Sequence, residues 1–442
     1  MKLHIAALIV IFSVFAPAVS ISWAGAKVYI DLSAPAEKKL PIAVEDFVFL
    51  DTKETKETKT PADLKAIGRE LMDALKDDLR FSNLFTIVKN NAPPARTPRP
   101  GEEDFEHWRS MGADILVKGA FSVGEEGLAV EVRLYDTVNE KRIMGKRYIG
   151  PASNPRRLIH YYGDELYEAL TGRKGIFSTK LLFVSDKSGV KEVYMSDYDG
   201  KNIAQVTKNK AINLSPQWSP DGKRIIYTSY KNGTPILYML DIRTGKETVL
   251  SAREGINIGA RFSPAGDEVA LTLSGEKSPE LHILNLKTKA YRQMTSNYGI
   301  DVSPSWSPDG KSLAFVSDIS GNPHIFVLNV EDGKAKRLTF EGVYNASPAW
   351  SPDGKKIAYS RSDAGPFNIW VMNSDGSDAR QMTFEGNSSS PSWSPDGRHI
   401  VFASVLGGKS GLYVMRPMGE GLTRIPSPGS ASSPAWSPRL DN

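Results

Sequence analysis

Residues 349–354 have the sequence Ala-Trp-Ser-Pro-Asp-Gly, and variants of this hexapeptide recur along the second half of the chain. Each variant carries an aromatic residue at its second position: Trp218, Phe262, Trp306, Trp350, Trp393 and Trp436. These residues are 44, 44, 44, 43 and 43 positions apart. A period of about 40–45 residues is typical of one four-stranded blade of a β-propeller. The repeat therefore predicts a six-bladed β-propeller.

The Ser-Pro-Asp-Gly part of the motif has the composition of a type I turn. Ser is favoured at the first position of such a turn, Pro presets φ at the second, and Gly is favoured at the fourth. The turn is predicted to join an inner strand that ends in the aromatic residue to a second strand, such as 356–360. The aromatic side chains are expected to pack between neighbouring sheets, rather than to form a cage that stacks on a ligand.

The sixth motif contributes only an inner strand, because the sequence ends at Asn442. Three strand-like segments precede the first motif, at 180–185, 192–195 and 205–207, and they match the second, third and fourth strands of the repeat. We therefore expect a propeller over residues 180–442 whose last blade combines strands from both ends of that region. Such closure leaves no open interface between blades.

Residues 41–173 alternate between strand-like and helix-like patterns, which is typical of an α/β domain. Spacings of three and four residues predict a helix from about Leu64 to Leu79 that also buries Ile67, Leu71 and Leu75. A later helix is expected to bury Leu158, Tyr162, Leu166 and Leu170 and to end at Gly172. The polar run at 51–60 is expected to be a solvated loop.

The first 26 residues have the features of a secretory signal peptide cleaved after Ala26. Lys2 precedes an apolar run from Ala6 to Ala16, and Ala24-Gly25-Ala26 matches a cleavage site. This run is too short to span a bilayer, which needs about 20 residues. No later segment is continuously apolar, so no direct membrane insertion of the mature protein is expected. Residues 27–40 are expected to form an extended segment ahead of the α/β domain.

The bulk composition narrows the classes of function. The chain has no cysteine, which excludes disulfides, cysteine nucleophiles, cysteine-metal sites and a lipid-modified cysteine. A net charge of +4, without Lys/Arg clusters interleaved with aromatic residues, argues against nucleic-acid binding. An exported chain without cysteine is compatible with a bacterial periplasm.

Several short motifs resemble chemical sites but lack essential parts. Gly408-Lys409-Ser410 ends like a phosphate-binding loop, yet Ala403 stands where that loop needs Gly. Residues 197–200 and 373–376 imitate the start of a calcium loop without its bidentate Glu, and hairpin turns are expected there. The histidines include no pair at the spacing of a zinc helix, and no G-x-S-x-G motif occurs. The sequence therefore predicts no enzyme activity, no cofactor and no metal site.

One polar pattern recurs with the repeat. Five residues before each aromatic position stand Asn213, Asn257, Asp301, Asn345, Ser388 and Ala431. The blade pattern places them in loops that enter the inner strands, near the mouth of the central channel. Either they are cap residues that support their own loops, or they form a polar ring that receives a peptide or protein surface. In the second case Ile212, Ile256, Tyr298, Tyr344 and Asn387 add contact area.

The order of these features resembles the TolB family, periplasmic components of the Tol–Pal cell-envelope system of Gram-negative bacteria. The likeness covers essentially the whole chain after residue 26. It is carried by Lys27-Val28-Tyr29-Ile30-Asp31, Leu116-Val117-Lys118-Gly119, Val132-Arg133-Leu134-Tyr135-Asp136, Ser196-Asp197-Tyr198-Asp199-Gly200, the repeated motif and Pro434-Ala435-Trp436-Ser437-Pro438.

This resemblance implies a periplasmic location and protein partners. The peptidoglycan-associated lipoprotein Pal is expected to dock over the propeller mouth. The inner-membrane-anchored TolA is expected to engage the N-terminal residues Lys27, Val28, Tyr29, Ile30 and Asp31. In the family, a change of order in this segment, here 27–36, couples the two events. The implied role is support of outer-membrane integrity and of constriction during cell division, with other envelope proteins as further possible partners.

The chain departs from the family's pattern in two places. Arg261, Phe262 and Ala265 replace the usual residues of the second motif, and the 51–60 insertion is unusual. Two other classes stay open from the residues alone: an exported peptidase-like enzyme with a gating propeller, and a carbohydrate-binding or sensor propeller. The first needs a hydrolase nucleophile, which no motif supplies. Capture of the soluble domain of Pal would separate these alternatives.

Overall fold

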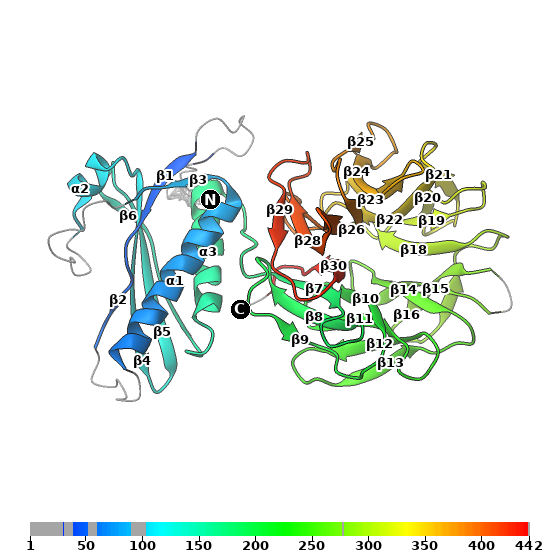
Figure 1. Ribbon diagram of the computed structural model, residues 1–442, viewed down its shortest axis with the longest axis horizontal. Coiled ribbons are helices and arrows are strands. Elements are labelled where there is room, and N and C mark those ends of the chain that lie inside the picture. Colours follow the sequence, from blue (N-terminus) through cyan, green and yellow to red (C-terminus); the bar gives the residue numbers. More distant parts are fainter. Residues whose placement is uncertain (1–29, 31–38, 52–59, 90–102, 276–277, 441–442) are drawn as a thin grey trace, which may run out of the picture.

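The computed structural model of the chain describes residues 30, 39–51, 60–89, 103–275 and 278–440. Figure 1 shows an α/β part, coloured blue to cyan, beside a ring of sheets coloured green to red. The ring consists of six four-stranded sheets. The predicted fold class, an α/β N-terminal domain plus a six-bladed β-propeller, is confirmed.

The α/β domain is built on one mixed sheet with the strand order β3-β1-β4-β5-β6, in which β2 also pairs with β4. Its strands are β1 (Leu40–Val44), β2 (Val48–Phe49), β3 (Phe85–Ile87), β4 (Ile115–Gly124), β5 (Gly127–Asp136) and β6 (Lys141–Gly150). β1 runs parallel to β3 and β4, whereas β4, β5 and β6 are antiparallel neighbours.

Two long helices, α1 (Pro61–Ser82) and α3 (Pro155–Thr171), pack together against the sheet (Figure 1). α1 begins where Thr60 and Asp63 form a reciprocal capping box, with Pro61 in the first turn. Its predicted apolar stripe is buried at Ile67, Leu71, Leu75 and Leu79. α3 ends at Gly172, whose positive φ of 71° suits a left-handed helix cap.

A short helix, α2 (Phe105–Ser110), lies against a second apolar cluster of the same domain. Trp108 of this helix is buried, and its indole Nε1 donates to Glu45 Oε1 at 2.8 Å. None of the helices in the described parts of the chain is long and apolar enough to cross a membrane.

The propeller blades follow one another along the chain. The first is β10 (Asn213–Trp218), β11 (Arg224–Ser229), β12 (Ile236–Asp241) and β13 (Glu247–Ser251), and the second is β14 (Asn257–Phe262), β15 (Glu268–Leu273), β16 (Glu280–Asn285) and β17 (Tyr291–Gln293). The third is β18 (Asp301–Trp306), β19 (Ser312–Ser317), β20 (His324–Asn329) and β21 (Ala335–Arg337). The fourth is β22 (Tyr344–Trp350), β23 (Lys356–Ser362), β24 (Asn368–Asn373) and β25 (Arg380–Gln381), and the fifth is β26 (Asn387–Trp393), β27 (Ile400–Leu406), β28 (Lys409–Met415) and β29 (Thr423–Ile425).

The sixth sheet joins distant parts of the chain. Its inner strand is β30 (Ala431–Trp436), and its other strands are β7 (Lys180–Ser185), β8 (Glu192–Asp197) and β9 (Ala204–Gln205). β30 pairs antiparallel with β7, with Ala431 opposite Ser185 and Trp436 opposite Leu181. The ring is therefore closed by hydrogen bonds between its two ends.

The repeated motif has the geometry of a turn followed by a second strand. In the fourth blade, the Gly354 amide donates to the Ser351 carbonyl at 2.9 Å, and Ser351 Oγ donates to Asp353 Oδ1 at 2.6 Å. Most aromatic residues of the motif also bond to the preceding blade. Trp306 Nε1 donates to the carbonyl of Arg261, and Trp393 Nε1 to that of Ala349. The tryptophans thus hold neighbouring blades together.

Each inner strand contains a β-bulge, at which the register to the second strand shifts. The third residue before the aromatic has a positive φ in all six blades: Ser215, Gly259, Ser303, Ser347, Ser390 and Ser433. A bulge redirects the side chains that follow it. The residue just before the aromatic consequently faces the central channel in five of the blades.

Candidate functional site

The antiparallel order within each blade places the connecting loops on two faces of the propeller. One face carries the Ser-Pro-Asp-Gly turns between first and second strands. The other, called the loop face below, carries the loops that lead from one blade to the inner strand of the next, and the hairpins between second and third strands.

The predicted polar ring lies at the loop-face ends of the inner strands, but its side chains are not on the surface. Asn213, Asn257, Asp301, Asn345 and Ser388 are all buried, with at most 1% of each residue exposed. Ala431, at the same position of the sixth blade, is buried as well. Direct contact of these side chains with a partner would require the loops above them to move.

Each of these side chains is bonded within its own surroundings. Asn213 Nδ2 donates to Glu192 Oε2 at 2.7 Å and to the Ala211 carbonyl at 2.8 Å. Asn257 Nδ2 donates to the Arg253 carbonyl at 2.7 Å. The geometry is that of the cap alternative, in which the residue supports the loop that precedes it.

Two further members act in the same way: Asp301 Oδ2 accepts from Asn297 Nδ2, and Asn345 Nδ2 donates to the Glu341 carbonyl. The Ser388 hydroxyl instead lies 3.0 Å from the Ser404 hydroxyl of β27. The buried ring therefore fixes the backbone of the loop face.

The loops held in this way expose large apolar side chains. Tyr298 is 80% exposed, Phe340 72% and Phe384 76%. Three further positions of the same loops, Ile212, Val343 and Tyr344, are also exposed. Of the neighbours expected to add contact area, Ile212, Tyr298, Tyr344 and Asn387 are exposed, whereas Ile256 is half-buried. Exposed aromatic side chains gathered on one face mark candidate protein-binding sites.

A hollow of about 720 Å³ opens on the loop face beside Tyr298. Glu280 and His282 of β16 lie in its wall. Burial raises the pKa of the Glu280 carboxyl and lowers the pKa of the His282 imidazole. The hollow gives this part of the loop face a concave shape that a projecting side chain of a partner can enter.

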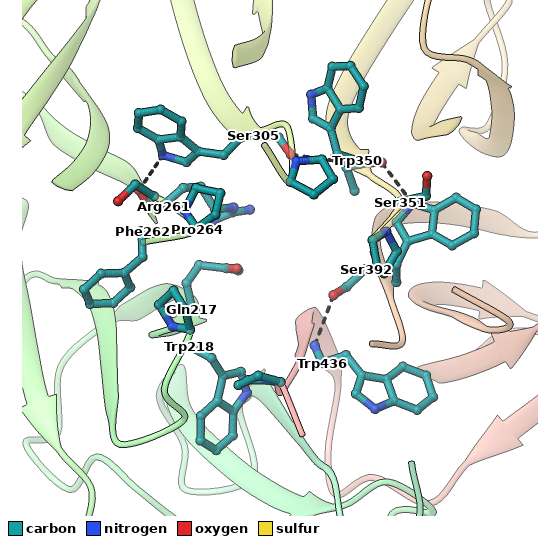
Figure 2. A pocket seen from close by; sticks show the side chains of 18 of the residues that line it. Gln217, Trp218, Arg261, Phe262, Pro264, Ser305, Trp350, Ser351, Ser392 and Trp436 are labelled. Carbon is teal, nitrogen blue, oxygen red and sulfur yellow. Dashed lines mark hydrogen bonds between the residues drawn. The ribbon is translucent and has the colours of Figure 1, made fainter. Parts of the chain in front are cut away.

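The central channel widens into a cavity of about 290 Å³ toward the opposite face, where the Ser-Pro turns lie (Figure 2). Its wall contains the residues that directly precede the motif's aromatic position: Gln217, Arg261, Ser305, Ala349 and Ser392. Arg261 is the only charged residue among those that line this cavity.

The short motifs that imitate chemical sites lie in hairpins. Lys409 begins β28, directly after the turn from β27, and the described chain after it contains no helix. The turns at 197–200 and 373–376 close with hydrogen bonds from the Gly200 and Gly376 amides to the carbonyls of Asp197 and Asn373. Within the described ranges, no group of three or more His, Asp or Glu side chains could hold a metal ion.

The predicted N-terminal site lies mostly outside the described residues, which include Ile30 but not Lys27, Val28, Tyr29 or Asp31. The Ile30 amide donates to the Leu170 carbonyl at 3.0 Å. Leu170 is in the last turn of α3, where carbonyls lack partners within the helix. Ile30 also packs against the core of the α/β domain. This residue is therefore fastened to the helix that leads toward the propeller.

A buried polar cluster, which sequence reasoning missed, joins the two domains. Asp78 of α1 lies 2.9 Å from Nδ1 of His160 in α3, and it accepts a hydrogen bond of 2.7 Å from the Tyr198 hydroxyl. Tyr198 belongs to the turn between β8 and β9 of the sixth blade. All three side chains are buried. One signal was present in the sequence: Asp78 interrupts the apolar stripe of α1 beside Leu75 and Leu79.

Burial lowers the pKa of His160, but the charge and hydrogen bond of the adjacent Asp78, together with the charge of Asp197, raise that pKa above its ordinary value. Around this cluster, Arg156 of α3 pairs with Asp199 at 2.6 Å. Phe81 of α1 stacks on His399 of the fifth blade, with ring centroids 4.5 Å apart. Charged, polar and aromatic contacts thus fix the α/β domain to the propeller.

Comparison with known proteins gives matches in both domains. A family model described as the TolB beta propeller domain matches residues 167–440, and one described as the TolB amino-terminal domain matches residues 28–143. The chain is 41% identical over 165 residues to the Tol-Pal system protein TolB of Geobacter metallireducens, a stretch of 37% of this chain and 38% of that relative. It is 41% identical over 200 residues to the protein of the same name from Syntrophotalea carbinolica, or 44% of each.

The chain thus spans less than half the length of these curated relatives. A solved structure, TolB from Acinetobacter baumannii, matches with a TM-score of 0.77 and 29% identity, over 91% of this chain and 98% of that one. The propeller model alone covers more than half of the sequence. The chain belongs to the TolB family.

Proposed function

We propose that the protein is a binding component of the Tol–Pal system in the bacterial periplasm, and that it holds partner proteins without catalysing a reaction. Membership of the TolB family supports the assignment, since family models of both TolB domains match the chain and a curated relative that matches 37% of it is named a Tol-Pal system protein. In this role it supports outer-membrane integrity and constriction during cell division.

The loop face is the proposed docking site for the lipoprotein Pal, and its exposed aromatic side chains carry this proposal. Tyr298, Phe340 and Phe384 project from loops of this face, and the loops of Tyr298 and Phe340 are held by the buried residues Asp301 and Asn345. Aromatic residues supply much of the binding energy at protein interfaces. Loops already held in position lose little conformational entropy on binding. The buried ring thus contributes by positioning these contacts.

The test is a titration of the soluble domain of Pal into the full mature chain, followed by calorimetry. Tyr298→Ala and Phe340→Ala are each expected to weaken binding by about 30-fold, the effect of a typical hot-spot residue. Val138→Ala is the matched control, because Val138 is 61% exposed in the turn between β5 and β6 of the α/β domain and so is not part of the loop face. Equal affinity of all variants would reject the loop face. Absence of saturable binding to the wild type would favour a peptidase-like or ligand-binding propeller.

The N-terminal segment is the proposed site for TolA. Ile30 is fastened to α3 through the Leu170 carbonyl, and α3 runs into the linker that enters the sixth blade at Lys180. A partner that takes hold of residues 27–31 competes with this bond. Binding of TolA would thus break a contact at the end of α3. The same helix contributes His160 and Arg156 to the domain interface.

Removal of residues 27–31 tests this second site. The shortened chain is expected to lose binding to TolA while its melting temperature changes little, since Ile30, the described residue of this segment, makes one backbone hydrogen bond to α3. Ile30→Gly is the milder variant, because it removes the apolar contact with the core and keeps the segment's length. Undiminished TolA binding by the shortened chain would place the site elsewhere.

A further inference from the structure

The central cavity contains a cation without a counter-charge. Arg261 stands where the other lining positions carry Gln217, Ser305, Ala349 and Ser392, and among the described residues it is the only charged one in the cavity wall. Figure 2 shows its side chain in the wall, with the cavity in front of it. This departure from the repeated motif therefore changes the charge of the channel.

Arg261 makes little use of its five N–H donors within the protein. Its Nη1 donates to the neighbouring Ala260 carbonyl at 3.2 Å, and no ion pair of this residue occurs in the part of the chain that the structure describes. Burial alone lowers the pKa of the guanidinium, to about 10, and no carboxylate offsets that effect. The group is still protonated near neutral pH. Arg261 is half-buried in the cavity wall, and a charge partly withdrawn from water is costly unless it is paired.

Three further groups in the cavity wall can donate hydrogen bonds. The Ser305 hydroxyl accepts from the Trp350 amide at 3.3 Å, and the Ser392 hydroxyl accepts from the Trp436 amide at 3.0 Å. A hydroxyl that accepts one bond keeps its own hydrogen for another acceptor. The Gln217 amide makes no hydrogen bond with the described residues, and in Figure 2 it points into the cavity.

We propose that the central channel holds an anion site, in which Arg261 binds a carboxylate or a small inorganic oxyanion with hydrogen bonds from Gln217, Ser305 and Ser392. The planar guanidinium suits a carboxylate or phosphate, because two parallel N–H donors match two oxygens. A cavity of about 290 Å³ admits such a group together with several waters, each of which takes about 30 Å³. The ligand is either a free ion or the acidic side chain of an inserted peptide.

This proposal is independent of the docking of Pal and TolA. The test uses the full mature chain and follows the fluorescence of the tryptophans that line the cavity. One arm titrates inorganic phosphate at fixed ionic strength. The other titrates a short Glu-containing peptide and its Gln counterpart. Saturable binding of phosphate identifies a free ion as the ligand, and binding of the Glu peptide in preference to the Gln peptide identifies an inserted carboxylate.

Arg261→Gln removes the charge and keeps a polar side chain of similar reach. Its affinity for the responsive probe is expected to fall about 10- to 100-fold, as for loss of a hydrogen bond to a charged group. Arg224→Gln is the control, because Arg224 lies over the Phe262 ring in the neighbouring blade, outside the cavity wall. It should bind like the wild type.

Melting temperatures give a second measurement on the same variants. Without added anion, Arg261→Gln should melt at or above the wild-type temperature, because it removes an unpaired, half-buried charge. Addition of phosphate or the Glu peptide should raise the melting temperature of the wild type and of Arg224→Gln only. Absence of a response to both probes, or an equal response of Arg261→Gln, would overturn the proposal.

Discussion

Replacement of Asp78 by Asn should uncouple the two domains. The carboxylate is fully buried, and it receives hydrogen bonds from His160 Nδ1 at 2.9 Å and from the Tyr198 hydroxyl at 2.7 Å. An Asn at this position keeps one acceptor oxygen but turns an NH₂ group toward one of the two donors. It also removes the charge that raises the pKa of His160.

The expected loss of stability is large because the affected groups lie away from water. Breaking a buried pair by removal of one partner costs about 3–5 kcal/mol. The Asn oxygen retains one contact, which favours the lower end, about 3 kcal/mol. For a domain of the propeller's size, this corresponds to a fall in melting temperature of about 6–12 °C.

Thermal unfolding, monitored by tryptophan fluorescence, measures this change in melting temperature. The rate of trypsin cleavage measures how accessible the linker between the domains is. Arg173 and Lys174 are exposed between α3 and β7, and Arg439 donates to the Lys174 carbonyl from the end of the propeller region. We expect faster cleavage there in Asp78→Asn.

Asp77→Asn is the matched control. Asp77 is the next residue of α1, but its side chain is 31% exposed and pairs with Lys201 at the surface. Such exposed pairs contribute about 0–1 kcal/mol. If Asp78→Asn had the same melting temperature and the same rate of trypsin cleavage as Asp77→Asn, the buried cluster would not be responsible for joining the domains.

The other predictions concern pH, ring closure and blade contacts. Because the folded pKa of His160 is raised above 6.5, its contribution is complete below about pH 6.5 and is lost as the pH rises through the folded value. The melting temperature of the wild type should therefore approach that of His160→Gln as the pH rises above about 6.5; a constant gap would contradict this. Deletion of residues 431–442 removes β30 from the sixth sheet and should sharply lower the melting temperature, whereas an unchanged curve would show that closure is dispensable. Trp393→Phe loses a hydrogen bond between blades, whereas Trp350 Nε1 has no bonding partner among the described residues. In urea unfolding, Trp393→Phe should therefore lower the free energy of unfolding by about 1 kcal/mol more than Trp350→Phe does. Equal losses would refute the assigned role of the indole bond.

The repeated motif was enough to predict the propeller from sequence. The six aromatic positions indicate the six blades because every blade repeats the same turn and the same packing position. Both features constrain which amino acids stand at a few neighbouring positions, so the repeat is visible in the sequence. The same holds for α1 and α3, whose apolar stripes and caps are local features. Turns, caps and apolar stripes are each determined by residues close together in the sequence, so they can be predicted from it.

The candidate sites were predicted less well, for physical reasons. The polar ring is at the expected ends of the inner strands, but its burial depends on how each loop folds back over the side chain of its first strand residue. The cluster around Asp78 unites residues separated by 82 and 120 positions. The channel position of Arg261 depends on the bulge at Gly259. None of these arrangements follows from local spacing.

The closure of the sixth blade has a mechanical consequence. The α/β domain is connected to the propeller at Lys180, the start of β7, and β7 has a neighbour on each side. Both neighbours, β30 and β8, are antiparallel to it. Tension drawn through the linker therefore loads two rows of hydrogen bonds in shear at once, whereas an edge strand would peel away bond by bond. The blade that completes the ring is also the place where the ring resists being pulled open.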